Sequence, residues 1–166
     1  MKNNLLMDFT VHKENSTVNV KREFSATIDD VWAAWTEPAI LDLWWAPAPW
    51  KSRTKSMDFK IGGRRIYAML GPEGEEHWAI ADFSSITPKT NFKYLDAFSD
   101  KEGNLNTEFP RSDWDVNFTE QGDLTTVDIA IKHKNLADLE MIIQMGFKEG
   151  FTIAMEGLDK IFKAKK

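Results

Sequence analysis

The feature that most constrains the fold is a series of short segments in which apolar and polar residues alternate. Alternation with a period of two is typical of strands that turn one face toward a core. Short turn signals separate the segments, for example at residues 71–74 and 121–123, so successive strands reverse direction. Sequential hairpins of this kind predict an antiparallel sheet. The predicted strands cover residues 57–61, 65–70, 78 to about 87, 92–98, 114–118 and 125–131.

One further strand and two short helices precede this series. Residues 18–24 alternate in the same way and predict the first strand. Thr27 is a suitable N-cap for a helix that includes residues 31–35, and the helix should end before Pro38 because a proline disfavours helical geometry in the residue before it. A second short helix is predicted over residues 39–44.

The C-terminal segment, residues 136–162, predicts one long helix that contains Gly146, Gly150 and Gly157. At about 100° per residue, these glycines fall within roughly 40° of one another. A surface helix normally carries a single apolar stripe, and this helix carries two, which indicates deep burial, a ligand or a partner. The order of strand, short helices, strand meander and final helix predicts the α+β class. Leu139, Ile142, Ile143, Ile153 and Ile161 share the glycine face, whereas Phe147, Phe151, Met155, Leu158 and Phe162 form the second face.

Composition excludes several classes of protein. A length of 166 residues predicts a single domain over residues 1–166. The net charge of −5 argues against nucleic-acid partners and against anionic membrane surfaces. Cysteine is absent, so disulfides and thiolate chemistry are excluded. We find no secretory signal and no apolar run long enough to span a membrane, and we therefore expect a cytoplasmic protein.

Seven tryptophans are many for a chain of this size, and they can form either a dense aromatic core or the wall of a pocket. The three glycines suggest a cavity between the final helix and the sheet, with residues 45–50 near its mouth, although close packing of the helix on the sheet would also explain them. The candidate ligand-binding residues are Trp45, Trp50, Tyr67, Met69, Trp78, Phe92, Tyr94, Trp114, Ile142, Gly146 and Gly150.

Three charged residues alternate in phase with apolar neighbours and are therefore expected to point into the interior: Arg22, Asp82 and Asp96. They are either internal ion pairs or polar groups that orient a ligand, and Arg22 is expected to reach Asp96 or Asp82. The histidines His12, His77 and His133 lack the spacing of metal ligands, so no metal and no cofactor is expected.

Several segments together resemble a known superfamily. The opening VKREFSATIDDVWAAWTEPAILDLWWAP is similar to that of the START-like (SRPBCC) helix-grip proteins. Two more segments resemble the branch named after the activator of heat-shock protein 90 ATPase, namely MDFKIGGRRIYAMLGPEGEEHWAIADFSSI and MGFKEGFTIAMEGLDKIF. The resemblance extends over residues 9–163. It implies a curved antiparallel sheet of about six or seven strands that grips a long C-terminal helix, with an apolar cavity between them.

We therefore expect a non-catalytic protein that binds an apolar or aromatic small molecule in this cavity. Two alternatives stay open. One is a protein-interaction or chaperone-activator-like module, which would show a filled cavity and an exposed patch. The other is a cyclase- or hydrolase-type enzyme, which would need a close acid–base pair in the cavity. The sequence is also compatible with a homodimer or with a protein partner.

Overall fold

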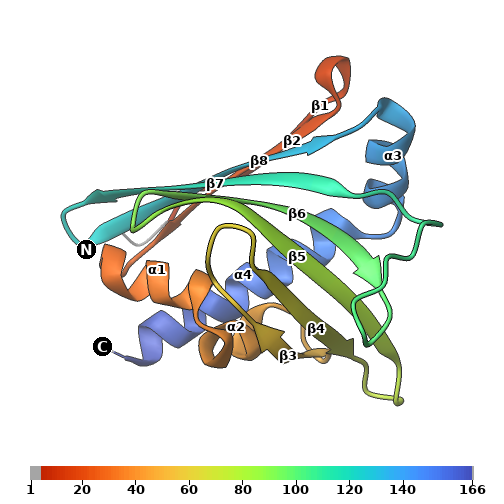
Figure 1. The fold of residues 1–166 in the computed structure, drawn as a ribbon. Coiled ribbons are helices and arrows are strands. Elements are labelled where there is room, and N and C mark those ends of the chain that lie inside the picture. Colours follow the sequence, from red (N-terminus) through yellow and green to blue (C-terminus); the bar gives the residue numbers. More distant parts are fainter. Residues whose placement is uncertain (1–4, 166) are drawn as a thin grey trace.

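One curved sheet of eight antiparallel strands forms the framework of the molecule (Figure 1). The computed structural model describes residues 5–165. The strand order is β1-β2-β8-β7-β6-β5-β4-β3, so both β1 and β3 lie at edges. The strands are β1 Met7–His12, β2 Thr17–Phe24, β3 Lys51–Met57, β4 Arg64–Leu70, β5 Glu76–Thr87, β6 Asn91–Ser99, β7 Ser112–Gln121 and β8 Leu124–His133.

Four α-helices complete the fold within the described residues: α1 Ile28–Thr36, α2 Pro38–Trp44, α3 Leu136–Gln144 and α4 Phe147–Ala164. A short 3-10 helix, η1 Lys13–Asn15, links β1 to β2. Helix α4 runs beneath the sheet, and α1 and α2 lie on the same side (Figure 1). We call the sheet face toward α4 the inner face. This arrangement confirms the predicted α+β helix-grip architecture.

The two short helices form where the capping signals place them. The Thr27 hydroxyl accepts a hydrogen bond from the Asp30 amide at 3.4 Å, and this bond satisfies one of the free N–H groups at the start of α1. Helix α1 ends at Thr36, and Glu37 after it is extended. Pro38 then occupies the first turn of α2, where its missing N–H is not needed.

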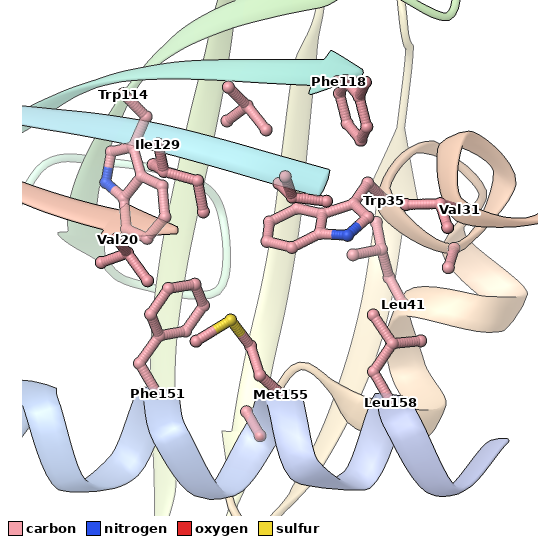
Figure 2. Close-up of a cluster of buried hydrophobic side chains, with 14 of the residues drawn as sticks. Val20, Val31, Trp35, Leu41, Trp114, Phe118, Ile129, Phe151, Met155 and Leu158 are labelled. Carbon is pink, nitrogen blue, oxygen red and sulfur yellow. The ribbon is translucent and has the colours of Figure 1, made fainter. Parts of the chain in front are cut away.

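The core lies between the inner face and α4. Phe151, Met155 and Leu158 project from α4 toward the sheet (Figure 2). Val20 and Ile129 from the sheet, fully buried, belong to the same cluster. The second apolar face predicted for the C-terminal segment is therefore the one that packs on the sheet.

The prediction of one continuous C-terminal helix is wrong. The chain breaks at Gly146, which has a φ of +89°, a backbone conformation that glycine adopts without a steric penalty. Helix α3 ends just before this residue and α4 begins just after it. Only Gly150 and Gly157 are therefore helical, and Ile153, expected on the apolar glycine face, is 44% exposed.

Two edge strands also differ from expectation. A strand was predicted at residues 57–61, but β3 ends at Met57, and Ile61 lies in the following turn with 65% of its surface exposed. Strand β3 is polar and largely exposed, so it lacks the apolar alternation that would reveal it. Strand β1 was also missed, although Met7, Phe9 and Val11 alternate with polar residues; it pairs only with β2 and raises the number of strands in residues 5–165 to eight.

Candidate functional site

A pocket of about 250 Å³ lies between the inner face and the α3–α4 corner. Strands β4 to β8 form its floor, and residues at the end of α3 and the start of α4 form its roof. Seven of the predicted ligand-binding residues line it, together with one of the predicted polar groups: Trp45, Tyr67, Met69, Trp114, Ile142, Gly146, Gly150 and Asp96.

Strand pleating brings the floor residues together. Tyr67 on β4 pairs with Ala79 on β5, and Ala79 pairs with Phe98 on β6, so all three side chains point to the inner face. Asp96 lies two residues before Phe98 and therefore points the same way. Trp114 on β7 is opposite Tyr94 and stacks on it with ring centroids 5.3 Å apart.

Six aromatic residues contribute to the walls. Phe147 and Phe151, one turn apart on α4, stack at 5.3 Å. Phe151 also meets Trp114 edge-on at 5.5 Å (Figure 2). Trp45, which follows α2 directly, lies 5.9 Å from the Trp114 ring and donates a hydrogen bond of 3.0 Å from its Nε1 to the Tyr67 hydroxyl. The rings are thus held in fixed orientations around the pocket.

Asp96 is the acidic group of the pocket. Its Oδ1 accepts a 2.7 Å hydrogen bond from the Ser112 amide, and its Oδ2 accepts one of 2.9 Å from Trp114 Nε1. Burial nevertheless raises the pKa of Asp96 to about 6, because the loss of hydration outweighs these two hydrogen bonds and the attraction of Arg111. The carboxyl group therefore changes its charge close to neutral pH.

Two tyrosines near Asp96 stay neutral. Burial raises the pKa of Tyr67, although Arg65 beside it acts in the opposite direction. Burial and the charge of Asp96 raise the pKa of Tyr94 well above its usual value. Both phenols therefore keep their protons and remain available as hydrogen-bonding groups.

Four of the predicted pocket residues lie elsewhere. Trp50 stands at the rim, with its ring 5.4 Å from that of His77, which lines the opening. Trp78 lies on the outer face, because its neighbour Ala79 points inward, and its Nε1 donates to Glu76 at 2.6 Å. Phe92 and Tyr94 are buried and border only a separate gap of about 20 Å³.

The predicted pairing of Arg22 with Asp96 or Asp82 is not formed. Two strands, β8 and β7, separate β2 from β6, which at about 4.8 Å per strand places these two strands roughly 14 Å apart, and the register offsets Arg22 from Asp96 along the strands as well. Arg22 instead approaches Asp159 of α4 at 3.8 Å. Asp82 lies on the outer face, where it binds Arg64 at 2.6 Å and Arg111 at 2.7 Å.

The sequence reasoning overlooked Arg65, which is only 3% exposed. Its guanidinium lies 3.9 Å from the centre of the Tyr67 ring and 3.4 Å from Asp42, and it donates to the hydroxyls of Ser52 and Thr54. Arg65 thus packs against the Tyr67 ring and helps to hold its orientation. The alternation of Arg65 with Tyr67 and Met69 on one strand was the signal that could have revealed it.

The comparisons with known proteins agree with this geometry. Residues 25–163 match the family model described as activator of Hsp90 ATPase homolog 1-like protein (AHSA1). The chain belongs to this family. A comparison with curated proteins returned no match, so the AHSA1 assignment rests on the family model and on solved structures.

Several solved structures are similar to this AHSA1 chain along almost its entire length. Protein Ms6760 from Mycobacterium smegmatis is 26% identical with a TM-score of 0.87, and the match covers 95% of this chain and 96% of that one. A protein from Arthrobacter aurescens is 25% identical with a TM-score of 0.89, covering 95% and 91%. A protein from Staphylococcus epidermidis is 25% identical with a TM-score of 0.82, covering 95% of both chains.

Two kinds of feature are absent from residues 5–165. None of the helices in this range is long and apolar enough to cross a membrane. No group of three or more His, Asp or Glu side chains within the range is arranged to hold a metal ion.

Proposed function

We propose that this AHSA1-family protein binds a small apolar or aromatic molecule in the pocket between the sheet and the α3–α4 corner. The observation that carries the proposal is the pocket itself: about 250 Å³, lined mainly by apolar residues that include six aromatic ones, with a few polar groups. Ligand sites typically combine apolar walls with a small number of placed polar groups. Family membership supports a ligand-binding or an activator-like module, and the open pocket favours ligand binding.

The size of the pocket limits the ligand. Sites for drug-sized molecules usually measure about 300–1,000 Å³, so a pocket of 250 Å³ fits a molecule of one or two rings better than a long lipid. The aromatic walls favour a planar ligand, because offset-stacked and edge-on contacts with rings add to the energy of burial.

Asp96 favours a second candidate, an enzyme that uses this carboxylate as a general base. Its pKa of about 6 suits proton transfer near neutral pH. An acid partner in a productive position would also be needed, and the neutral hydroxyl of Tyr67, which lines the same pocket, is a group of that kind. Chemical change of a bound ligand on incubation with the protein would favour the enzyme over the binding module.

The test begins with native mass spectrometry of the purified protein, in which a co-purified small molecule would support binding. Titration with an environment-sensitive apolar dye then measures the pocket directly. Gly150→Leu is the informative variant, because Gly150 lines the pocket and a Cβ there meets only Pro47, at 3.6 Å. The added side chain should occupy the pocket and abolish dye binding.

Gly157→Leu is the matched control. It places the same side chain on the same helix, but its Cβ would meet nothing within 4 Å, and the residue does not line the pocket. This variant should bind the dye like the wild type. Equal dye binding by both variants, or no dye binding by the folded wild type, would contradict the proposal and favour the interaction module.

A further inference from the structure

We propose that the ligand of this pocket carries a positively charged nitrogen, such as a protonated amine, and that this nitrogen pairs with Asp96. The inference rests on the proposed function and names the chemical class of the ligand. Its basis is a charge that the protein leaves uncompensated inside an otherwise apolar site.

Three other aspartates of the sheet and its helices have cationic partners. Asp42 binds Arg65, Asp82 binds Arg64 and Arg111, and Asp159 is close to Arg22 and Lys163. A shielded carboxylate without a cation is costly, which explains why these three are paired. Within residues 5–165, by contrast, no Lys or Arg nitrogen lies within 4.0 Å of the Asp96 carboxylate, although this residue lines the pocket.

The guanidinium of Arg111, whose charge acts on Asp96, forms its hydrogen bonds with other groups. Its Nε donates to the backbone carbonyl of Asp96 at 3.0 Å, and its Nη2 donates to Asp82 on the outer face at 2.7 Å. Arg111 is therefore paired with the Asp82 carboxylate on the outer face and not with the carboxylate of Asp96.

The Asp96 carboxylate can accept more hydrogen bonds than the protein supplies. Each of its oxygens accepts one hydrogen bond from the protein, from Ser112 and from Trp114. A carboxylate offers about four lone-pair sites, so about two remain. Because Asp96 lines the pocket, these sites are accessible to a donor on a bound ligand. An ammonium group is a donor without acceptor capacity, and it carries the missing charge.

The aromatic side chains of the pocket also favour a cation. The faces of Trp, Tyr and Phe attract cations, and sites built from several such rings are suited to ammonium ligands. Trp114 and Phe151 line the pocket together with Asp96. Trp45 and Tyr67 line it too, although the Arg65 guanidinium already lies 3.9 Å from the centre of the Tyr67 ring and 5.8 Å from that of Trp45. A cation there would gain both the carboxylate and the ring faces, whereas a carboxylate ligand would be repelled by Asp96.

The other charged groups around Asp96 do not replace this cation. Arg65, behind Tyr67, is paired with Asp42, and Asp113 adds a negative charge on the outer face. His77 lies at the opening, on the exposed end of β5. The roof residues from the α3–α4 corner are uncharged: Ile142, Met145, Gly146, Phe147, Gly150 and Phe151.

The experiment compares three probes of nearly equal shape: benzylamine, benzyl alcohol and benzoate. Binding to the full-length protein is followed by NMR through the indole N–H signal of Trp114, the group that donates to Asp96. Benzylamine should bind more tightly than benzyl alcohol at pH 7, and benzoate should bind least. The affinity for benzylamine should rise about tenfold from pH 5 to pH 7 as Asp96 ionises, since its pKa is about 6, whereas the affinity for benzyl alcohol should stay constant.

Two variants locate the effect. Asp96→Asn should remove the preference for the amine together with its pH dependence. Asp113→Asn is the matched control, because it removes an equal charge from an exposed position on the same strand as Trp114, outside the pocket, and it should preserve the preference. If Asp96→Asn does not fold, the pH profiles of the wild type with the amine and the alcohol still decide the question.

Each outcome has a separate meaning. If benzyl alcohol binds the wild type as tightly as benzylamine at pH 7, the inference is overturned while the proposed pocket function stands. If the amine preference is lost equally in Asp113→Asn, the attraction belongs to the general acidity of the protein, and the inference also falls. If neither the probes nor the apolar dye bind the folded wild type, the proposed function itself fails, and the inference with it.

Discussion

Replacing the three C-terminal glycines by alanine, one at a time, should give stability changes of opposite sign. Gly150 and Gly157 lie inside α4, where glycine costs about 1 kcal/mol relative to alanine. A Cβ at Gly157 would meet nothing within 4 Å, and one at Gly150 would make an ordinary contact with Pro47 at 3.6 Å. Each of these two substitutions should therefore stabilise the protein by about 1 kcal/mol and raise its Tm by about 2–4 °C.

Gly146 should behave in the opposite way. A Cβ there would also meet nothing within 4 Å, so space is not the limit. Its φ of +89°, however, is a left-handed conformation that costs an alanine about 1–2 kcal/mol. Gly146→Ala should thus lower the Tm by several degrees.

Urea denaturation and thermal melting of the three variants measure these changes. Circular dichroism checks that the helix content is unchanged. If Gly146→Ala raises the stability as the other two variants do, Gly146 is helical in solution, and the separation of α3 from α4 is wrong. If Gly150→Ala is strongly destabilising instead, the α4 backbone approaches the segment around Pro47 more closely than the structure shows.

Three further predictions concern buried charges. Asp159→Ala should lower the free energy of unfolding by about 3 kcal/mol, because it leaves Arg22, whose side chain is 11% exposed, without its carboxylate partner. A double-mutant cycle with Arg22→Met, measured by urea denaturation, should show coupling between the two residues, and additive losses would contradict the pairing. The free energy of unfolding of the wild type should fall by up to about 3 kcal/mol as the pH rises from about 4 to about 6, because the raised pKa of Asp96 makes the folded state hold more protons than the unfolded state in that window. Asp96→Asn should flatten this part of the plot of stability against pH, and an unchanged slope would exclude Asp96 as its source. Arg65→Lys should lower the free energy of unfolding by about 1–3 kcal/mol, since an ammonium group cannot reach Asp42, Ser52 and Thr54 together. An unchanged melting curve would show that the hydrogen bonds of the guanidinium contribute nothing to stability.

Local signals predicted the elements that follow local rules. Alternation located most of the central strands, and the Thr27 cap and Pro38 marked the ends of α1 and the start of α2. The edge strand β3 was missed because it exposes most of its side chains, so its sequence need not alternate between apolar and polar residues. Gly146 escaped for a related reason, since glycine is compatible both with a helix and with the left-handed break that separates two helices.

The pocket shows the same division between local and long-range information. Alternation correctly suggested that Tyr67, Asp96 and Trp114 point inward, and they meet in one pocket. Asp82 has a similar local pattern but faces outward. Strand β5 buries residues on both faces, Ile80 on the outer face and Phe83 on the inner face, so the pattern could not tell which face was which.

The sequence by itself determined the α+β class, the antiparallel meander, the aromatic character of the interior and the presence of charged groups within it. The tertiary structure alone decided which charges pair and where a pocket remains. Pairing depends on strand order, since β8 and β7 separate Arg22 from Asp96, while α4 brings Asp159 to Arg22. The pocket depends on how the α3–α4 corner meets the curved sheet, and that geometry is set by contacts between segments far apart in the chain, which periodicity of two or 3.6 residues does not encode.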